Sequence, residues 1–334
     1  MLRSRVAVRV CLGTCFGLAL LTPRPVVAES GAPSGTPYDK VSFYFAAHED
    51  DWQLFMNPSA FEDVADRSTK TVFVHVTAGD AGLGTGTGGK NYPYYLAREN
   101  GARTAIRFMA DAGERPHNET AGPMPFHGHP VYRVRYGNTA AYFLRLPDGH
   151  PRGVGFSGTG NQSLQRFAAG EIPSLTAIDG STRYDGWADL VTTLRAILDY
   201  ERVHSTSIKL NVAEQNLAIN PNDHSDHLMT AKLALEAGQG LACARRLYYV
   251  DYASSHMPAN LDPHQRDMES SVLAVTAAGI LERDHASIWT NYFQSYLGRN
   301  YFRVEESRGR CEEPAADVLQ AASKPQPKGA LAEH

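Results

Sequence analysis

The sequence carries no excess of basic charge. Its 334 residues include 32 Lys and Arg against 36 Asp and Glu, which gives a formal net charge of −4. A protein that binds the phosphates of a nucleic acid needs a basic surface, so this balance argues against nucleic acid as the partner. No repeat, composition shift or charge run divides the chain before its C-terminal tail, and its length fits one large domain or two small ones.

The sequence also lacks an apolar run of the roughly 20 residues that a membrane-spanning helix needs. The apolar stretch over residues 10–21 is well short of that length, follows Arg5 and Arg9, and precedes a small-residue site that ends at Ala28. This order is typical of a secretory signal peptide over residues 1–28. We therefore expect no membrane span, cleavage after Ala28, and a protein that is secreted or periplasmic.

Cysteine is scarce as well, with four residues in the chain. Cys11 and Cys15 lie in the predicted signal peptide, so the exported chain keeps Cys243 and Cys311. In an oxidising compartment these two are expected to form one disulfide that fastens the C-terminal region to the body of the protein. Metal ligation by either cysteine is disfavoured, since neither has a second ligand nearby.

The two ends of the mature chain have compositions typical of disordered segments. Residues 30–37 are rich in Gly, Pro and Ser, and residues 312–334 are rich in Ala, Pro and Lys. The region between them, 38–311, is long enough to bury a full core without disulfide staples. We predict that it forms the folded domain.

Two short polar clusters stand next to apolar elements. Residues 48–51, His-Glu-Asp-Asp, follow the apolar run 41–47, which indicates a buried strand. Residues 224–227, His-Ser-Asp-His, lead into 228–235, a run of good helix formers with an apolar face. Side chains just past a strand of an open α/β sheet lie at the edge where ligands bind. Together the clusters supply three histidines and three aspartates, namely His48, Asp50, Asp51, His224, Asp226 and His227.

This residue set suits a catalytic metal site. A catalytic zinc ion usually takes three protein ligands from His, Asp or Glu and keeps one position open. Hydrolysis also needs one side chain that accepts a proton and another that steadies the oxyanion. Either cluster alone is common by chance, and the alternative is that its members are loop polar groups or helix caps, a role open to Asp223. The pairing of both clusters favours the metal site.

At these residues the sequence resembles the LmbE-like, or PIG-L, family of zinc-dependent N-deacetylases. Residues 47–51 resemble the family's Ala-His-x-Asp-Asp motif, and residues 224–227 resemble its His-x-Asp-His motif. Ordered landmarks of the resemblance extend over residues 41–237. The resemblance implies a bound divalent ion, zinc or another metal, with His48, Asp51 and His227 as ligands, Asp50 as general base and His224 as partner of the oxyanion.

The sequence departs from the family pattern at two positions beside the first motif. Glu49 stands where the family usually has Pro, and Trp52 stands where it usually has Glu. Neither is a ligand position, so the implied metal site is retained. We expect both residues at the rim of the pocket, where they bear on the choice of substrate.

Two further residues are candidates for the site. Arg98, in a helix expected over 94–109, resembles the arginine of the family's Arg-Glu segment, which implies contact with the hydroxyls of a sugar. An ordinary salt bridge on the helix surface is the equal alternative for Arg98. Asp226 is a candidate to orient one of the histidines through a hydrogen bond.

Two loop segments also carry suggestive residues. Residues 84–90 approach a phosphate-binding P-loop, but Asn91 stands where the magnesium-binding Ser or Thr belongs. We interpret residues 79–89 instead as a loop over the active site. Three histidines, His117, His127 and His129, lie in a segment rich in Gly and Pro. They could form a second metal site, but exposed loop histidines are the more common case.

Hydrophobic patterning predicts an α/β fold. Strands are expected at 41–47, 71–77, 174–178, 207–212 or 215–219, and 247–250. Helices are expected at 59–66, 94–109, 163–169, 187–200, 228–235, 262–281 and 286–297. Residues 131–136 and 141–146 alternate around a turn and predict a β-hairpin. Strands that alternate with helices indicate a Rossmann-like, mostly parallel sheet with helices on both faces and the hairpin as an insertion.

These observations predict an exported, metal-dependent amide hydrolase with a small-molecule or glycan substrate. The resemblance implies that it removes acetyl from an N-acetylated amino sugar or glycoconjugate. The same site acting on a different acyl amide, such as a conjugate, lipid-linked or peptide-like group, is one alternative. The other is a non-catalytic carbohydrate-binding protein that keeps the fold, although pure binding has no use for a base such as Asp50.

Overall fold

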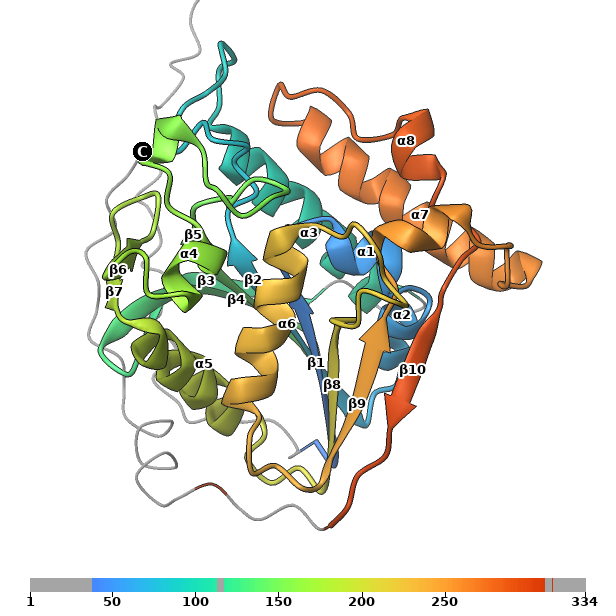
Figure 1. Cartoon of the computed structure of the whole chain (residues 1–334). Coiled ribbons are helices and arrows are strands. Elements are labelled where there is room, and N and C mark those ends of the chain that lie inside the picture. The colour runs from blue at the N-terminus through green and yellow to red at the C-terminus, as the bar shows by residue number, and fades with distance from the viewer. Residues whose placement is uncertain (1–37, 113–116, 310–313, 315–334) are drawn as a thin grey trace, which may run out of the picture.

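An eight-stranded sheet forms the centre of the computed structural model, which describes residues 38–112, 117–309 and 314 (Figure 1). The strand order is β10-β9-β8-β1-β2-β5-β4-β3. The strands are β1 (Lys40–Ala46), β2 (Thr69–Thr77), β3 (Glu119–Phe126), β4 (His129–Tyr136), β5 (Thr139–Leu146), β8 (Ser207–Ala213), β9 (Ala244–Tyr249) and β10 (Phe302–Glu305). The predicted signal peptide, Cys311 and all of the predicted tail except Pro314 lie outside the described residues.

The middle of the sheet is parallel and its edges are antiparallel. β9, β8, β1, β2 and β5 run parallel to one another, whereas β10 pairs antiparallel with β9, and β4 pairs antiparallel with β5 and with β3. The predicted mostly parallel sheet is thus confirmed. The predicted hairpin is present as β4 and β5, and because β5 also pairs with β2, it continues the main sheet.

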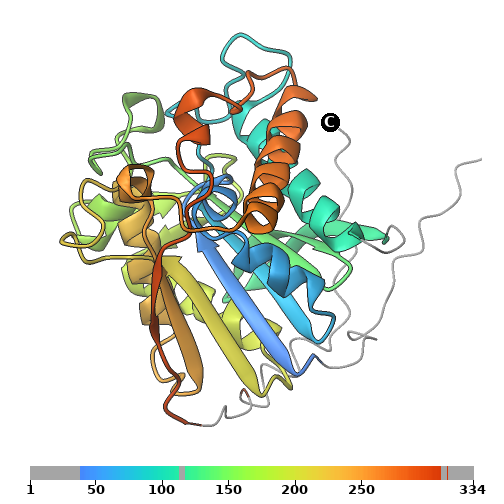
Figure 2. The ribbon, with the colours of Figure 1, turned by 90° about the vertical axis from the view of Figure 1, so that its right-hand side faces the viewer.

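Helices cover both faces of the sheet, as predicted (Figures 1 and 2). One face packs against α4, α5 and α6, and the other packs against α1, α2, α3 and α7. The helices are α1 (Asp51–Phe55), α2 (Ser59–Ala65), α3 (Tyr94–Asp111), α4 (Leu164–Ala168), α5 (Trp187–Glu201), α6 (Ser225–Ala237), α7 (Pro263–Leu281) and α8 (Asn291–Gln294), with short 3₁₀ turns at Ser157–Thr159 and Tyr252–His256.

The burial of β1 shows how the sequence specifies this layering. Val41, Phe43 and Phe45 join the core on one face of the sheet, and Tyr44 and Ala46 join the core on the other. Successive residues of a strand point to opposite faces, and a parallel sheet covered on both sides buries both sets. The chain that leaves β1 is therefore held firmly at the sheet edge.

The predicted helix over 286–297 is wrong in extent, because only α8, Asn291–Gln294, is helical there. Asp284, just after α7, adopts a φ of +60°, which turns the chain out of the helix. The next residue, His285, contacts the carbonyl of Tyr92 through Nε2 at 2.6 Å and so fixes this turn against the chain just before α3. The predicted strand at 174–178 is β6 (Ser174–Thr176), which pairs with β7 (Arg183–Asp185) in a separate small sheet.

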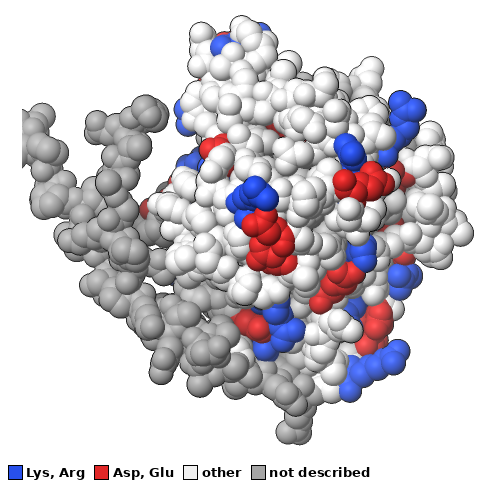
Figure 3. Space-filling model, turned by 60° about the vertical axis from the view of Figure 1, so that its left-hand side comes forward, with Lys and Arg blue, Asp and Glu red and all other residues white. Residues whose placement is uncertain are grey.

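The surface bears charges of both signs. On the face in Figure 3, Lys and Arg side chains lie interspersed with Asp and Glu in small groups. Within residues 38–112 and 117–309, none of the helices combines the length and the apolar character needed to cross a lipid bilayer.

Candidate metal centre

The carboxyl ends of the parallel strands deliver the candidate site. β1 ends just before the cluster at 48–51, and β8 leads through a loop to the cluster at 224–227. β5 is followed by Asp148, and β9 is followed by Asp251. Since this edge of an open α/β sheet is where ligands bind, the two polar clusters meet where the sequence predicts.

Three of the predicted residues form a triangle of donor atoms. The Nδ1 of His48 lies 3.4 Å from the Oδ1 of Asp51, and the Nε2 of His227 lies 3.2 Å from the same oxygen. The two imidazole nitrogens are 3.3 Å apart. All three side chains are buried. Each therefore directs one lone-pair atom at a common centre.

The dimensions of this triangle fit a zinc ion. Donors that sit about 2.0–2.1 Å from a tetrahedral zinc lie about 3.3–3.4 Å from one another. The observed edges of 3.2, 3.3 and 3.4 Å match that spacing. Two imidazoles and one carboxylate are also a usual ligand set for a catalytic zinc. His48, Asp51 and His227 are thus one group of described residues that could hold such an ion.

The charges in the triangle favour a cation at its centre. Burial alone would lower the pKa of the His48 and His227 imidazoles, but the Asp51 carboxylate outweighs it and holds both pKa values well above the usual range. Burial would likewise raise the pKa of Asp51, yet the two imidazoles hold it well below its usual range. Asp51 thus stabilises positive charge between the two rings.

Carboxylates behind the triangle orient both imidazoles. The Nε2 of His48 faces Asp226, whose Oδ2 is 3.5 Å away and accepts a hydrogen bond from the Gly149 backbone at 2.7 Å. The Nδ1 of His227 faces Asp223 at 2.9 Å and Asp251 at 3.2 Å. A carboxylate on the far nitrogen fixes the ring and the tautomer of a metal-binding histidine. The Asp226 carboxylate therefore faces the nitrogen of His48 that lies outside the triangle.

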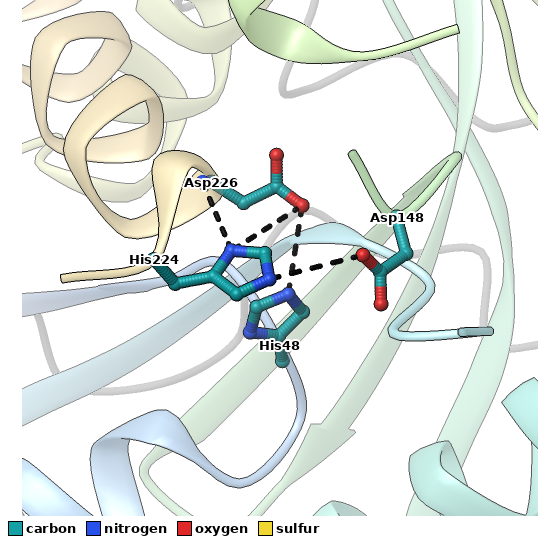
Figure 4. Close-up of side chains that lie close together, drawn as sticks. All are labelled: His48, Asp148, His224 and Asp226. Carbon is teal, nitrogen blue, oxygen red and sulfur yellow. Dashed lines mark hydrogen bonds and ion pairs between the residues drawn. The ribbon is translucent and has the colours of Figure 1, made fainter. Parts of the chain in front are cut away.

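His224 lies beside the triangle (Figure 4). Its ring meets the ring of His48 edge-on, with the centroids 4.7 Å apart. Its Nδ1 accepts a hydrogen bond from the Asp226 backbone at 3.1 Å and so caps α6. The cap leaves Nε2 as the N–H donor, which points toward Asp148 at 4.0 Å. Burial, together with the charge of neighbouring His48, lowers the pKa of His224, so its ring is a neutral donor.

The N-cap of α6 is therefore His224, and the alternative that Asp223 caps this helix is wrong. The carboxylate of Asp223 turns inward to His227 and to the Asn220 amide, which donates to it at 2.8 Å.

Asp50 has a different partner from Asp51, because it pairs with Arg98. One guanidinium nitrogen contacts the Oδ1 of Asp50, and another donates to the carbonyl of Gly79 at 2.9 Å. The Nε of Arg98 lies 3.2 Å from Glu49. The Arg98 side chain is 11% exposed, so the alternative of an ordinary surface salt bridge is wrong. The adjacent aspartates Asp50 and Asp51 thus face different partners.

The expectation that Glu49 and Trp52 line the pocket rim is also wrong, because both are buried, with 1% and 0% exposure. Glu49 lies under Arg98, and burial raises the pKa of its carboxyl to about 8 although the guanidinium opposes the shift. Trp52 packs on Phe73 and donates its indole N–H to the Nε2 of His75 at 3.1 Å. Both residues therefore support the site through buried contacts and do not line its rim.

The Gly-rich segment borders the site at its start. The Gly79 carbonyl accepts from Arg98, and buried Asp80 accepts hydrogen bonds from the backbones of Gly84 at 2.7 Å and Asp148 at 2.9 Å. Asp80 therefore ties the beginning of this segment to the turn after β5.

The three loop histidines have other partners. His129 contacts Thr182 at 2.7 Å and Asp189 at 3.0 Å, and His127 lies 3.7 Å from the same aspartate. His117 packs edge-on against Tyr136. Among the described residues, the groups close enough to hold an ion include none of these three, so the hypothesis of a second metal site there gains no support.

Cys243 is disulfide-bonded. Its predicted partner, Cys311, lies outside the described residues. The Arg308 backbone donates to the carbonyl of Ala242 at 2.7 Å, so the chain leading to residue 311 runs past Cys243.

Sequence reasoning missed Asp148 and Asp251. Each is a single acidic residue just past a predicted strand, 141–146 in one case and 247–250 in the other. The strand-end rule that singled out the cluster at 48–51 would have found both residues had it been applied to every strand.

Comparison with known proteins adds no assignment. A scan against protein-family models finds no match, and a search of curated proteins finds none either.

Proposed function

We propose that the protein is an exported, metal-dependent amide hydrolase that removes acetyl from an N-acetylated amino sugar or glycoconjugate, as its resemblance to LmbE-like (PIG-L) deacetylases implies. The donor triangle of His48, Asp51 and His227, with its zinc-like edges of 3.2–3.4 Å, is the observation that carries the proposal. When bound, a zinc ion supplies Lewis acidity and lowers the pKa of water.

Asp50 serves as the general base. Its Oδ1 contacts Arg98, which leaves Oδ2 to take a proton from the attacking water. The protonated carboxyl then returns that proton to the leaving amine. Arg98 keeps the carboxylate in place, and the resemblance adds contact with a sugar hydroxyl to its role.

His224 serves as the electrophilic partner. With Nδ1 committed to the α6 cap, its Nε2–H is the donor that meets the carbonyl oxygen as negative charge develops there. A neutral imidazole suffices for this role, because the donor is preorganised by the helix cap and needs no rearrangement during the reaction.

A substrate panel tests the proposal. Purified protein would be incubated with N-acetylated amino sugars and with amides that carry other acyl groups, and both released acid and free amine would be measured. We expect acetate release from acetamido sugars, loss of the activity with a chelator, and recovery with zinc. An Asp50→Asn variant provides the control for contaminating hydrolases.

Each other outcome points elsewhere. Release of a different acid from another acyl amide would show that the substrate is not an acetamido sugar. If zinc-loaded protein hydrolysed none of the amides, the non-catalytic carbohydrate-binding alternative would be favoured.

A further inference from the structure

We propose that Asp251 is a positioning residue that, together with Asp223, clamps His227 by its Nδ1 and strengthens metal binding at the opposite nitrogen. The inference rests on the proposed metal centre and names a residue outside both sequence motifs. Asp251 reaches the site from the end of β9, whereas Asp223 precedes α6, the helix that carries His227.

Carboxylates and aromatic rings hold the imidazole of His227 in place. The Nδ1 of His227 lies 2.9 Å from Asp223 and 3.2 Å from Asp251, so the ring is gripped from two different elements. Phe55 and Tyr252 pack against the ring, with centroids 5.8 and 5.1 Å away. The imidazole is thereby held with Nε2 facing Asp51 and His48.

Hydrogen-bond satisfaction alone does not account for a second carboxylate at this position. The Nδ1 of an imidazole carries one proton, so it cannot give a full hydrogen bond to two carboxylates. Asp223 has an additional donor in the Asn220 amide, at 2.8 Å. Asp251 has no such support, because its other oxygen, Oδ1, is buried and lacks a hydrogen-bond partner among the described residues.

The charges lead to the same conclusion. Among the described residues, His227 is the only cationic partner of the Asp223 and Asp251 carboxylates. Two buried carboxylates with so little compensation weaken a fold. A dication on the far side of the same imidazole would offset their charge, and their charge would in turn increase the electron density that His227 donates. The two carboxylates are therefore expected to increase the affinity for the metal ion and to lower the stability of the metal-free protein.

The test is the zinc affinity of the full-length protein and its Asp251→Asn variant, measured by competition with a chromogenic chelator. We expect zinc binding to weaken about 10–100-fold, the usual effect of losing a carboxylate behind a metal-binding histidine. The thermal midpoint of the metal-free variant should stay equal or rise, because a poorly compensated buried charge has been removed.

A matched control is Glu269→Gln. Glu269 is also a buried carboxylate with one oxygen that has no hydrogen-bond partner in the described part of the chain, but its other oxygen accepts from the Gly298 backbone and not from a histidine. Its replacement should leave zinc affinity unchanged. If Asp251→Asn does not fold, Asp223→Asn tests the same clamp from the side of α6.

The metal centre and the clamp can be disproved separately. Wild-type protein without zinc affinity would overturn the metal centre and the clamp with it. Wild-type binding that Asp251→Asn leaves within twofold, or a metal-free midpoint that falls while affinity is kept, would overturn the clamp alone and make Asp251 a structural residue.

Discussion

Acid is expected to weaken the contact between Trp52 and His75, which holds α1 and its Asp51 against the sheet. His75 lies in β2 and is fully buried. Because its Nε2 accepts the indole N–H at 3.1 Å, its proton must sit on Nδ1, which faces the Tyr142 carbonyl at 3.3 Å. A second proton would have to enter on Nε2, directly against the indole N–H.

The size of the effect follows from the pKa. Burial lowers the pKa of His75 from 6.5 to about 4, although the Tyr142 carbonyl and the charge of Asp51 oppose the shift, and Arg98 adds to it. Each pKa unit corresponds to about 1.36 kcal/mol, so the folded state loses about 3 kcal/mol once the pH is below both values.

The sign is fixed by proton uptake. Between pH 6.5 and about 4 the unfolded chain binds the proton on His75 and the folded protein does not. The contribution is therefore fully present above pH 6.5 and is lost as the pH falls toward 4.

Urea unfolding of the wild type and of His75→Gln, at several pH values from 7.5 to 4, isolates this residue because all other titrating groups are shared. We expect the wild type to exceed the variant most at neutral pH, and the difference to shrink by about 3 kcal/mol at acid pH. A difference in unfolding free energy that does not change with pH would refute the reasoning.

Three other outcomes are expected. Asp50→Asn should keep its zinc content while acetate release falls about 10²–10⁴-fold, whereas Asp51→Asn should lose zinc. If metal analysis showed zinc lost from Asp50→Asn and kept by Asp51→Asn, the two roles would be reversed. Gly79→Ala should destabilise the protein by about 1–3 kcal/mol in urea unfolding and lower its activity with zinc retained. The reason is that Gly79 has a φ of +50° and an added Cβ would lie 2.6 Å from Glu49 and 2.7 Å from Arg98. Unchanged activity would contradict the role of Arg98 in the mechanism. Free-thiol titration of the unreduced, exported protein should find no reactive thiol at Cys243 or Cys311, and two thiols per chain would contradict the predicted pairing.

The parallel core of the sheet was predictable from the sequence, because β1 and β2 are rich in apolar and β-branched residues and β8 alternates apolar with polar residues. β3 was not predictable in this way. It contains Gly122, Pro123 and Pro125, which normally argue against a strand. It exists because it is an antiparallel edge strand paired on one side with β4, where proline can be tolerated.

The site was predictable where residues come in dense clusters. The polar residues at 48–51 and 224–227 meet because the chain delivers both to one edge of the sheet, a rule of topology that a strand prediction already contains. The orientation of each side chain was not predictable. Glu49 and Trp52 sit beside a ligand in sequence, yet contacts with Arg98 and His75, distant in the chain, bury them. Asp251 carries no motif of its own.

The central claim is that His48, Asp51 and His227 hold one metal ion on which amide hydrolysis depends. Its most direct test is metal stoichiometry, measured by elemental analysis beside acetate release, in the wild type and in His227→Ala after chelation and return of zinc. The proposed site predicts one zinc ion per chain in the wild type, and parallel loss of zinc and activity in the variant. Full zinc retention with full activity in His227→Ala would contradict it.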